Sequence, residues 1–273
     1  MRSSATANSE PIKTVYYTDE LGDDFVTVTR NHLEIDGTYR YQRKKIPWVF
    51  LEWLVYRVIM TPFAFLYSKW KYGYRIENHH LLRQAKNEGY FVYGNHVLMD
   101  GDAFLPSMVC FPKKTKVVVH ADNLSHPTPI RRWIELCGAI PVPTKHSGMR
   151  PFLNALGENI GQGHAIQIYP EAHVWHFYTG IRPFDAASFR YPLRFHAPVF
   201  CATTTFQKSK HGKTPKVTVY VDGPFYADES LTTERAQAQQ LRDVVYNTMV
   251  ERAKNSTYEA IRYVKSDSGK ENP

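Results

Sequence analysis

The sequence predicts an α/β fold, in which strands alternate with helices along the chain. The first observation is a series of short runs of β-branched and aromatic residues bounded by glycine, proline or charged residues, which is typical of buried strands. The second is that segments with helical periodicity separate these runs. The chain has 273 residues, enough for a full hydrophobic core, and no internal repeat at a fixed period. One α/β domain with extensions is therefore expected.

Strands and helices can be assigned in order along the chain from residue 72. Runs rich in Val, Ile, Tyr and Phe predict strands at 72–76, 89–93, 116–119, 165–171, 199–204 and 217–221. Helical patterns are found at 81–86, 103–109, 129–137, 150–160 and 232–254, and a basic amphipathic segment covers 183–196. The stretch 139–145 contains Pro141 and Pro143, which have no backbone N–H, so it is expected at a sheet edge or in a loop.

Composition divides the chain into four regions. An N-terminal extension, residues 1–45, is rich in tyrosines and acidic residues and predicts a small extended or hairpin-like cover. Residues 46–71 form an apolar helical segment, residues 72–225 the main domain, and residues 226–273 a C-terminal helix and tail. The chemistry is expected within the main domain.

The apolar segment predicts contact with a membrane. Only Glu52 and Arg57 interrupt its run of apolar residues, and Pro62 is expected to kink or break the helix. Because a straight span of about 20 apolar residues is interrupted, we expect a helix or a bent helical pair lying in one leaflet. The alternative is a buried core helix of a soluble protein. Basic residues suited to headgroups and aromatic residues suited to the interface are Arg40, Arg43, Lys44 and Lys45, and Trp48, Trp53, Tyr56 and Trp70.

The net charge of +8 implies acidic partners, which include phospholipid headgroups, phosphorylated metabolites and nucleic acid. The three cysteines, Cys110, Cys137 and Cys201, form no CxxC pair and suit a reducing cytoplasm. The first ten residues lack the apolar core of a signal peptide, so secretion is not expected.

His96 is the candidate catalytic residue, because it follows the predicted strand 89–93 at the position where open α/β sheets place ligands. A neutral imidazole can take a proton from an alcohol near pH 7 if a carboxylate on its other ring nitrogen holds the tautomer. Two carboxylates, Asp100 and Asp102, compete for this role. Nearby glycines indicate a loop, so helical spacing does not choose between them. The alternative is an ordinary loop histidine beside an aspartate that caps the next helix.

Four short motifs occur in order between residues 73 and 225. They are Asn95-His96 with a following aspartate, Gly138-Ala139-Ile140-Pro141 with Lys145, Pro170-Glu171, and Ala197-Pro198-Val199. In this order they resemble the blocks of the glycerolipid acyltransferase family, typified by 1-acylglycerol-3-phosphate acyltransferases. The stretch 182–190 is similar to the family's segment between the last two blocks. Four motifs in order are much more specific than any one alone.

The chain departs from the family pattern at two of these motifs. The family places its aspartate five residues after the histidine, whereas Asp100 and Asp102 are four and six residues after His96. The neighbouring residues align Asp102, with one residue inserted, which gives a variant His-x5-Asp motif. The third motif keeps Glu171 but lacks the usual Thr and Arg. The cation that binds phosphate is therefore expected to be Arg182 or Lys145.

The resemblance implies a glycerol-3-phosphate acyltransferase-like fold, a mixed β-sheet flanked by helices, with a membrane-associated N-terminal segment. It implies that His96 is the general base and that Asp102 orients it. The side chains implied in substrate binding are Asn95, Lys145, Glu171 and Arg182. The acyl donor would be acyl-CoA or acyl carrier protein and the acceptor lysophosphatidate or a related lysolipid, with no cofactor. Anionic lipids at the cytoplasmic face of the membrane are the expected partner.

Other functions can be weighed against the same residues. A metal site would draw on Glu171, His173 and His176, but a zinc-hydrolase motif such as HExxH is missing and no metal is expected. A serine hydrolase is disfavoured because no Gly-x-Ser-x-Gly occurs. The remaining alternatives are a catalytically inactive lipid-binding protein at the membrane surface and, with less support, a basic nucleic-acid-binding protein.

Overall fold

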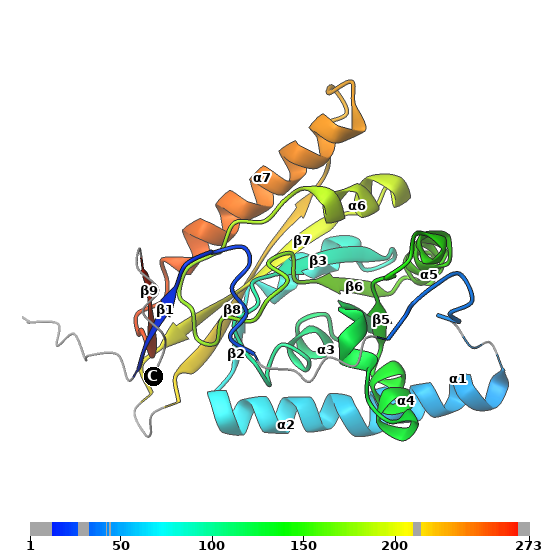
Figure 1. Cartoon of the computed structure of the whole chain (residues 1–273), viewed down its shortest axis with the longest axis horizontal. Helices are drawn as coiled ribbons and strands as arrows, with labels where there is room; N and C mark the ends of the chain where they lie inside the picture. Colours follow the sequence, from blue (N-terminus) through cyan, green and yellow to red (C-terminus); the bar gives the residue numbers. More distant parts are fainter. Residues whose placement is uncertain (1–12, 27–32, 42, 44, 210–213, 267–273) are drawn as a thin grey trace, which may run out of the picture.

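The computed structural model of the chain describes residues 13–26, 33–41, 43, 45–209 and 214–266. The expectations for the start of the N-terminal extension, for Lys44 in the basic cluster and for the end of the tail lie outside the described residues. The described part contains a seven-stranded sheet between two layers of helices, with a small two-stranded sheet at one side (Figure 1).

The seven strands form one mixed sheet in the order β2-β8-β7-β3-β6-β4-β5. Their bounds are β2 Arg75–Glu77, β3 Tyr90–Gly94, β4 Thr115–Val119, β5 Ala139–Pro141, β6 Ala165–Ile168, β7 Val199–Gln207 and β8 Lys216–Phe225. β3, β4, β5, β6 and β7 are parallel, whereas β8 is antiparallel to β7 and β2 is parallel to β8. The expected mixed sheet flanked by helices is confirmed, and β5 lies at its edge, where its prolines cost no central ladder bond.

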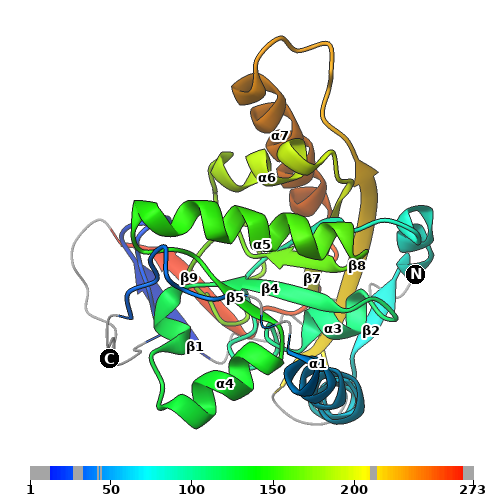
Figure 2. The same cartoon turned by 90° about the vertical axis from the view of Figure 1, so that its right-hand side faces the viewer.

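Helices cover both faces of the sheet (Figures 1 and 2). On one face lie α1 Ile46–Trp53, the π-helical turn η1 Leu54–Met60, α2 Thr61–Tyr72, α3 Leu105–Val109 and α4 Thr128–Leu136. On the other face lie α5 Met149–Gly161, α6 Arg190–Phe195 and α7 Glu234–Ala253. Short 3-10 turns are η2 His79–Ala85, η3 Ala121–Leu124, η4 His146–Gly148 and η5 Ala187–Phe189.

β3 lies at the centre of the sheet and is buried on both faces. Successive side chains of a strand point to opposite faces, so Tyr90 and Val92 join the hydrophobic cluster on the α2 and α3 side. Phe91 and Tyr93 join the cluster on the α5 and α7 side. This double burial explains why the β3 sequence is a continuous apolar run.

A two-stranded parallel sheet joins the two ends of the described chain. β1 Lys13–Tyr17 pairs with β9 Ile261–Lys265. The N-terminal segment is extended, as predicted, and within its described residues β1 pairs with a strand from the other end of the chain rather than with a neighbouring strand of a hairpin. Tyr17 and Tyr263 pack against the indole of Trp175, with ring centroids 4.8 and 4.9 Å away.

The apolar segment forms one uninterrupted helical stretch, Ile46–Tyr72, whereas the sequence predicted a kink or break at Pro62. The break is absent because the π-helical turn η1 precedes the proline and Pro62 falls in the first turn of α2, where its missing N–H is no loss. Among the described residues, this is one helix long and apolar enough, by length and composition, to cross a membrane.

Polar groups within the apolar segment attach it to the domain. Glu52 forms salt bridges with Lys114 and Lys116, at 2.9 and 2.5 Å. Arg57 donates a hydrogen bond to the Pro112 carbonyl. Tyr56, which was expected at interface depth, instead lies buried, and its hydroxyl accepts a hydrogen bond from a backbone N–H of β4. These groups face the protein because each finds a partner there.

The C-terminal helix α7 belongs to the main hydrophobic core, so we expect its apolar face to be essential for stability. Leu241 is buried in the cluster formed with β3 and α5. Leu241→Ala should lower the free energy of unfolding by about 2–5 kcal/mol through the lost contacts and the cavity left behind. Urea denaturation measures this loss, and Arg235→Ala at an exposed position of α7 is the control. Equal small effects of both variants would contradict the assignment of α7 to the core.

Candidate active site

The candidate site lies where the carboxyl ends of β3 and β6 meet. The two strands are neighbouring and parallel, so the loops that follow them emerge at the same edge of the sheet. His96 follows β3 by two residues, and Glu171 follows β6 by three. Sheet topology therefore places the first and third sequence motifs side by side.

His96 and Asp102 form a hydrogen-bonded pair. The His96 Nδ1 atom lies 2.7 Å from Asp102 Oδ2, and the Asp102 side chain is almost completely buried. The same oxygen accepts a hydrogen bond of 2.9 Å from the Leu98 N–H, and the Asp102 N–H donates to the Leu98 carbonyl at 3.0 Å. The loop thus makes a tight turn at Leu98 that brings Asp102 back to His96, although five residues lie between them in the sequence.

Asp100 faces a different set of partners. Its carboxylate accepts hydrogen bonds from Lys71, Tyr67 and Tyr72, all on α2. Burial alone would raise the pKa of Asp100, but these hydrogen bonds outweigh it and lower the pKa to about 2. The sequence did not choose between the two aspartates. In the structure Asp102 forms a hydrogen bond with the imidazole, whereas Asp100 forms hydrogen bonds with side chains of α2.

Tyr169 holds the imidazole from the side, a role that the sequence analysis missed. The two rings stack with centroids 4.5 Å apart and an interplanar angle of 16°. The Tyr169 hydroxyl also donates to the Asp102 carbonyl oxygen at 2.8 Å. The available signal was its position directly after β6, at the same sheet edge as His96.

Asn95 does not reach the surface of the site. Its side chain donates to the Thr204 carbonyl at 3.0 Å and accepts from the Thr204 N–H at 2.8 Å. With both amide groups bonded to β7 and the residue buried, Asn95 cannot contact substrate in this arrangement. The expected substrate-binding role is replaced by a structural one, which fixes the backbone just before His96.

Glu171 and Arg182 form a buried ion pair beneath the histidine loop. Glu171 accepts the His96 backbone N–H at 3.0 Å and the Arg182 backbone N–H at 3.1 Å, and the Arg182 guanidinium lies 3.4 Å from its carboxylate. Burial raises the pKa of Glu171, although Arg182 and the two N–H donors oppose the shift. Arg182 is only 1% exposed. Both side chains are buried in this arrangement, whereas the sequence predicted Arg182 as a candidate phosphate-binding cation and Glu171 as a substrate-binding residue.

The Arg182 guanidinium is held mainly by protein groups other than the carboxylate. It donates to the His173 carbonyl and lies over the Trp175 ring, 4.9 Å from the centroid. Its Nε and Nη1 atoms are buried and have no hydrogen-bond partner within the described part of the chain. An Arg buried in this way acts as a structural cation under the loop.

The segment after Glu171 lies along the histidine loop and pins it. The Trp175 N–H donates to the His96 carbonyl at 3.1 Å, and the Phe177 N–H donates to the Val97 carbonyl at 2.8 Å. The His176 Nδ1 atom accepts the Met99 N–H at 3.2 Å. The Nδ1 atom of His176 is thus occupied by a backbone donor, and no group of three potential metal ligands occurs among the residues that the structure describes.

Lys145 lies far along the same sheet edge. It follows β5, which is three strands from β3, a separation of roughly 14 Å at the usual strand spacing. Its ammonium forms an exposed salt bridge of 3.0 Å with Glu34. The structure therefore does not bring Lys145 to the histidine, where it was expected to bind substrate.

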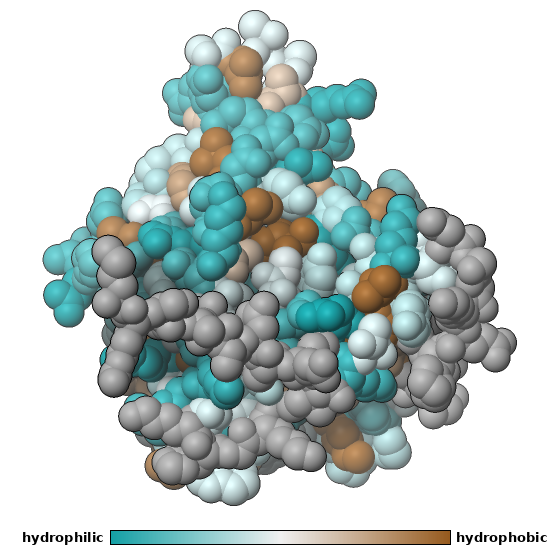
Figure 3. All heavy atoms as spheres, turned by 90° about the vertical axis from the view of Figure 1, so that its left-hand side faces the viewer, coloured by the Kyte–Doolittle hydropathy of each residue, from teal (hydrophilic) through white to brown (hydrophobic). Residues whose placement is uncertain are grey.

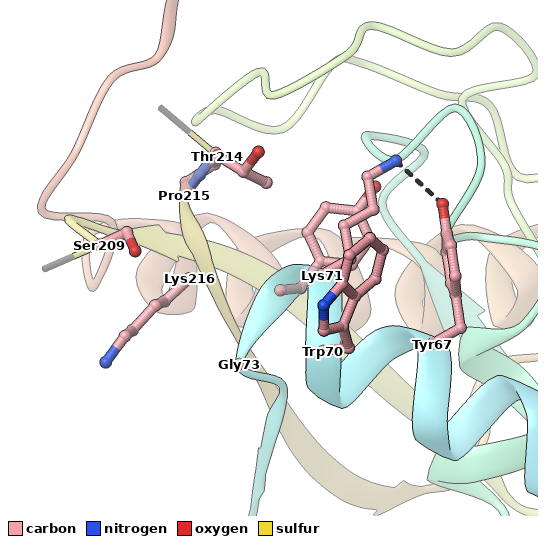
Figure 4. A pocket seen from close by; sticks show the side chains of 9 residues that line it. Tyr67, Trp70, Lys71, Gly73, Ser209, Thr214, Pro215 and Lys216 are labelled. Atoms are coloured by element: carbon pink, nitrogen blue, oxygen red, sulfur yellow. Dashed lines mark hydrogen bonds between the residues drawn. The ribbon is translucent and has the colours of Figure 1, made fainter. Parts of the chain in front are cut away.

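A cavity of about 580 Å³ lies between the last turn of α2 and the residues that flank the connection from β7 to β8 (Figure 4). Tyr67 and Lys71, two of the residues that bind Asp100, line it, with Trp70 between them. In Figure 4 the Lys216 ammonium points away from Lys71. Since neither His96 nor Asp102 lines this cavity, we assign it no chemical role.

The arrangement at His96 is suited to base catalysis. With the Nδ1–H donating to Asp102, the Nε2 lone pair of a neutral imidazole is left to accept a proton. The side chain is 21% exposed, and no hydrogen bond to Nε2 is found within the described ranges. A hydroxyl group that reached Nε2 could therefore be deprotonated there.

Comparison with known proteins agrees with this fold. No family model and no curated protein sequence matches the chain. Among solved structures, it is similar to the 1-acyl-sn-glycerophosphate (LPA) acyltransferase PlsC from Thermotoga maritima. The two share a fold. The TM-score is 0.54 over 79% of this chain and 85% of PlsC, at 14% sequence identity.

Removing one member of the buried ion pair should destabilise the protein strongly. Arg182→Met leaves the Glu171 carboxylate buried without its cation, so we expect a loss of about 3–5 kcal/mol in urea denaturation at neutral pH. With the cation gone, burial raises the pKa of Glu171 further. When the pKa of a carboxyl group is higher in the folded than in the unfolded state, the free energy of unfolding falls as the pH rises. The loss of stability in Arg182→Met should therefore be larger at pH 8 than at pH 5.

The double variant Glu171→Gln/Arg182→Met is the matched control. It removes both charges, so it should be more stable than Arg182→Met alone, and its loss should not depend on pH in this range. If the double variant loses as much unfolding free energy as Glu171→Gln and Arg182→Met lose together as single variants, the two charges do not interact.

Proposed function

We propose that the protein is an O-acyltransferase that moves a fatty acyl group from a thioester to the hydroxyl of lysophosphatidate or a related lysolipid. The observation that carries this proposal is the 2.7 Å contact between His96 Nδ1 and Asp102, with Nε2 left open at a sheet edge. The fold shared with an LPA acyltransferase and the order of the four sequence motifs support the same chemistry.

In the proposed reaction, His96 Nε2 takes the proton of the acceptor hydroxyl as its oxygen attacks the thioester carbonyl carbon. Asp102 stabilises the imidazolium that forms and keeps the ring in the required tautomer. The tetrahedral intermediate then collapses, the carbon–sulfur bond breaks, and the imidazolium returns its proton to the leaving thiolate. The products are an ester and a free thiol, and no acyl-enzyme is needed.

Glu171, Asn95 and Tyr169 act in this proposal as positioning residues. Each binds the backbone or the ring of the loop that carries His96 rather than an exposed surface. Holding a base within a fraction of an ångström of its acceptor is worth several orders of magnitude in rate. Acyl-CoA or acyl carrier protein is the proposed donor, and the reaction needs no cofactor or metal.

The helical stretch 46–72 is proposed to lie on the membrane rather than to cross it. One face of it is attached to the domain through Glu52, Tyr56 and Arg57. Its other face exposes large apolar residues along its whole length, from Ile46 to Trp70. Crossing a bilayer would detach the first face, whereas lying in one leaflet satisfies both. The cytoplasmic face of the membrane and its anionic lipids are the proposed location and partner.

The proposed activity can be tested with purified protein, a radiolabelled long-chain acyl-CoA and lysophosphatidate. The wild type should form labelled phosphatidate and release one free thiol per ester. His96→Ala should lower the rate by about 10²–10⁴-fold, because it removes the base, while its urea denaturation midpoint stays close to that of the wild type. A wild type that binds lysophosphatidate without transferring acyl groups from either donor would favour the inactive lipid-binding alternative.

The two aspartates should differ sharply in this assay. Asp102→Asn keeps the shape of the side chain but loses the carboxylate that orients His96, so kcat should fall several hundredfold or more. Asp100→Asn should leave kcat within a few-fold of the wild type, because Asp100 binds α2 and not the imidazole. The reverse order would refute the assignment of Asp102.

A further inference from the structure

Helix α4 is exposed to an unusual degree for a helix of a folded domain. Of its nine residues, Thr128–Leu136, only Leu136 is buried. Ile130 and Trp133, three residues apart and so on one helix face, are 50% and 41% exposed. Surface helices normally bury their apolar stripe against the core. α4 buries Leu136 but leaves Ile130 and Trp133 exposed.

α4 lies beside the first part of the apolar helix. Figures 1 and 2 both place α4 next to α1 at the same end of the molecule. Arg43 connects the two helices, because it forms a 2.9 Å salt bridge with Glu135 of α4 and lies 4.3 Å from the Trp48 ring of α1. The large apolar residues exposed on the neighbouring stretch are Ile46, Val49, Phe50, Leu51, Trp53, Val58, Ile59, Phe63, Phe65, Leu66 and Trp70.

The charges of α4 favour an anionic surface. Arg131 and Arg132 follow Ile130 directly, and neither forms a salt bridge within the described part of the chain. The one acidic residue of the helix, Glu135, is neutralised by Arg43. An exposed tryptophan next to unpaired arginines is the combination that suits the headgroup region of a membrane with acidic lipids.

The coloured atoms on the side at the left of Figure 1 do not show this combination. Figure 3 shows the side at the left of Figure 1, where the atoms not drawn in grey are mostly hydrophilic and apolar residues form small separate groups. The exposed apolar residues of α4 and of residues 46–70 are therefore concentrated on one side of the molecule.

We propose that α4 is a second membrane-binding element, which inserts Ile130 and Trp133 into the leaflet beneath the apolar helix while Arg131 and Arg132 bind lipid phosphates. A single helix lying on a bilayer leaves the attached domain free to rotate about the helix axis. A second contact to one side of that axis removes this rotation. α4 would thereby fix the height and direction of the His96 edge relative to the membrane. This inference rests on the proposed position of the helical stretch 46–72 on the membrane but not on the proposed acyl transfer, since membrane binding is measured without substrate.

The test is sedimentation of the full-length protein with vesicles of phosphatidylcholine alone or with 30% phosphatidylglycerol. Ile130→Ser/Trp133→Ser should weaken binding to both vesicle types by about tenfold, because two partly buried apolar side chains are lost from the leaflet. Arg131→Gln/Arg132→Gln should weaken binding by roughly fivefold per arginine, but only when phosphatidylglycerol is present and at low salt.

Matched controls separate this effect from general loss of apolar surface or charge. Tyr226→Ser changes an exposed aromatic residue directly after β8, in the connection that leads to α7 on the opposite face of the sheet from α4. Arg190→Gln/Arg235→Gln removes two exposed charges from α6 and α7. Both controls should bind vesicles like the wild type, and all variants should keep the wild-type urea denaturation midpoint.

A second measurement places Trp133 in the bilayer directly. Phospholipids brominated on their acyl chains quench tryptophans that enter the leaflet, and Trp133→Phe keeps the apolar face intact. The quenched fraction of the emission should therefore fall in Trp133→Phe without a change in vesicle binding. Unchanged quenching, or an Ile130→Ser/Trp133→Ser variant that binds like the wild type, would overturn the proposal. Loss of self-association in that variant with vesicle binding intact would instead make α4 a contact between copies of the chain.

Discussion

The candidate site depends on the hydrogen bonds that the buried carboxylate of Glu171 accepts. It comes from the end of β6, accepts a backbone N–H from the His96 loop that follows β3, and accepts another from Arg182. Two loops and a cation meet at one group that water does not reach. A carboxylate is unusually effective there, because its two oxygens accept several hydrogen bonds and each is stronger in a medium of low dielectric constant. Glu171 thus fixes the backbone that positions His96.

The apolar helix also holds the His96 loop, through hydrogen bonds to Asp100. Asp100 binds three side chains of α2, while Asp102, two residues later, binds the imidazole. Any movement of α2 relative to the domain would act on the loop through Asp100. The helix that is proposed to lie on the membrane and the residue proposed to be the base are therefore part of one continuous set of contacts.

Much of this architecture could be predicted from the sequence because its determinants are local. Apolar runs located β3, β6, β7 and β8 to within a few residues, and helical periodicity located α4, α5 and α7. The prolines of residues 139–145 correctly predicted a sheet edge, since a missing N–H has the same consequence in any fold. The histidine loop was identified from its place after a buried strand.

What the sequence could not supply depended on burial and on partners distant in the chain. A buried Arg182 and an exposed one look alike in sequence, so the sequence could not indicate its pairing with Glu171. It could not indicate the hydrogen bonds of Asn95 either, because their partner, Thr204, is more than 100 residues away. The helix continues through Pro62, and the sequence could not indicate this because no single residue encodes the π-helical turn that precedes the proline. The pairing of β1 with β9 joins the two ends of the chain, which no local pattern can indicate.

The turn at Leu98 has a consequence for how such proteins are found by sequence. The Asp102 carboxylate reaches the His96 imidazole because the chain turns back between Leu98 and Asp102. The hydrogen bond requires only that the two side chains meet in space, so the number of residues between them can vary. A search that demands a fixed interval between histidine and aspartate would discard this chain. A search for an aspartate that returns to the preceding strand's end would keep it.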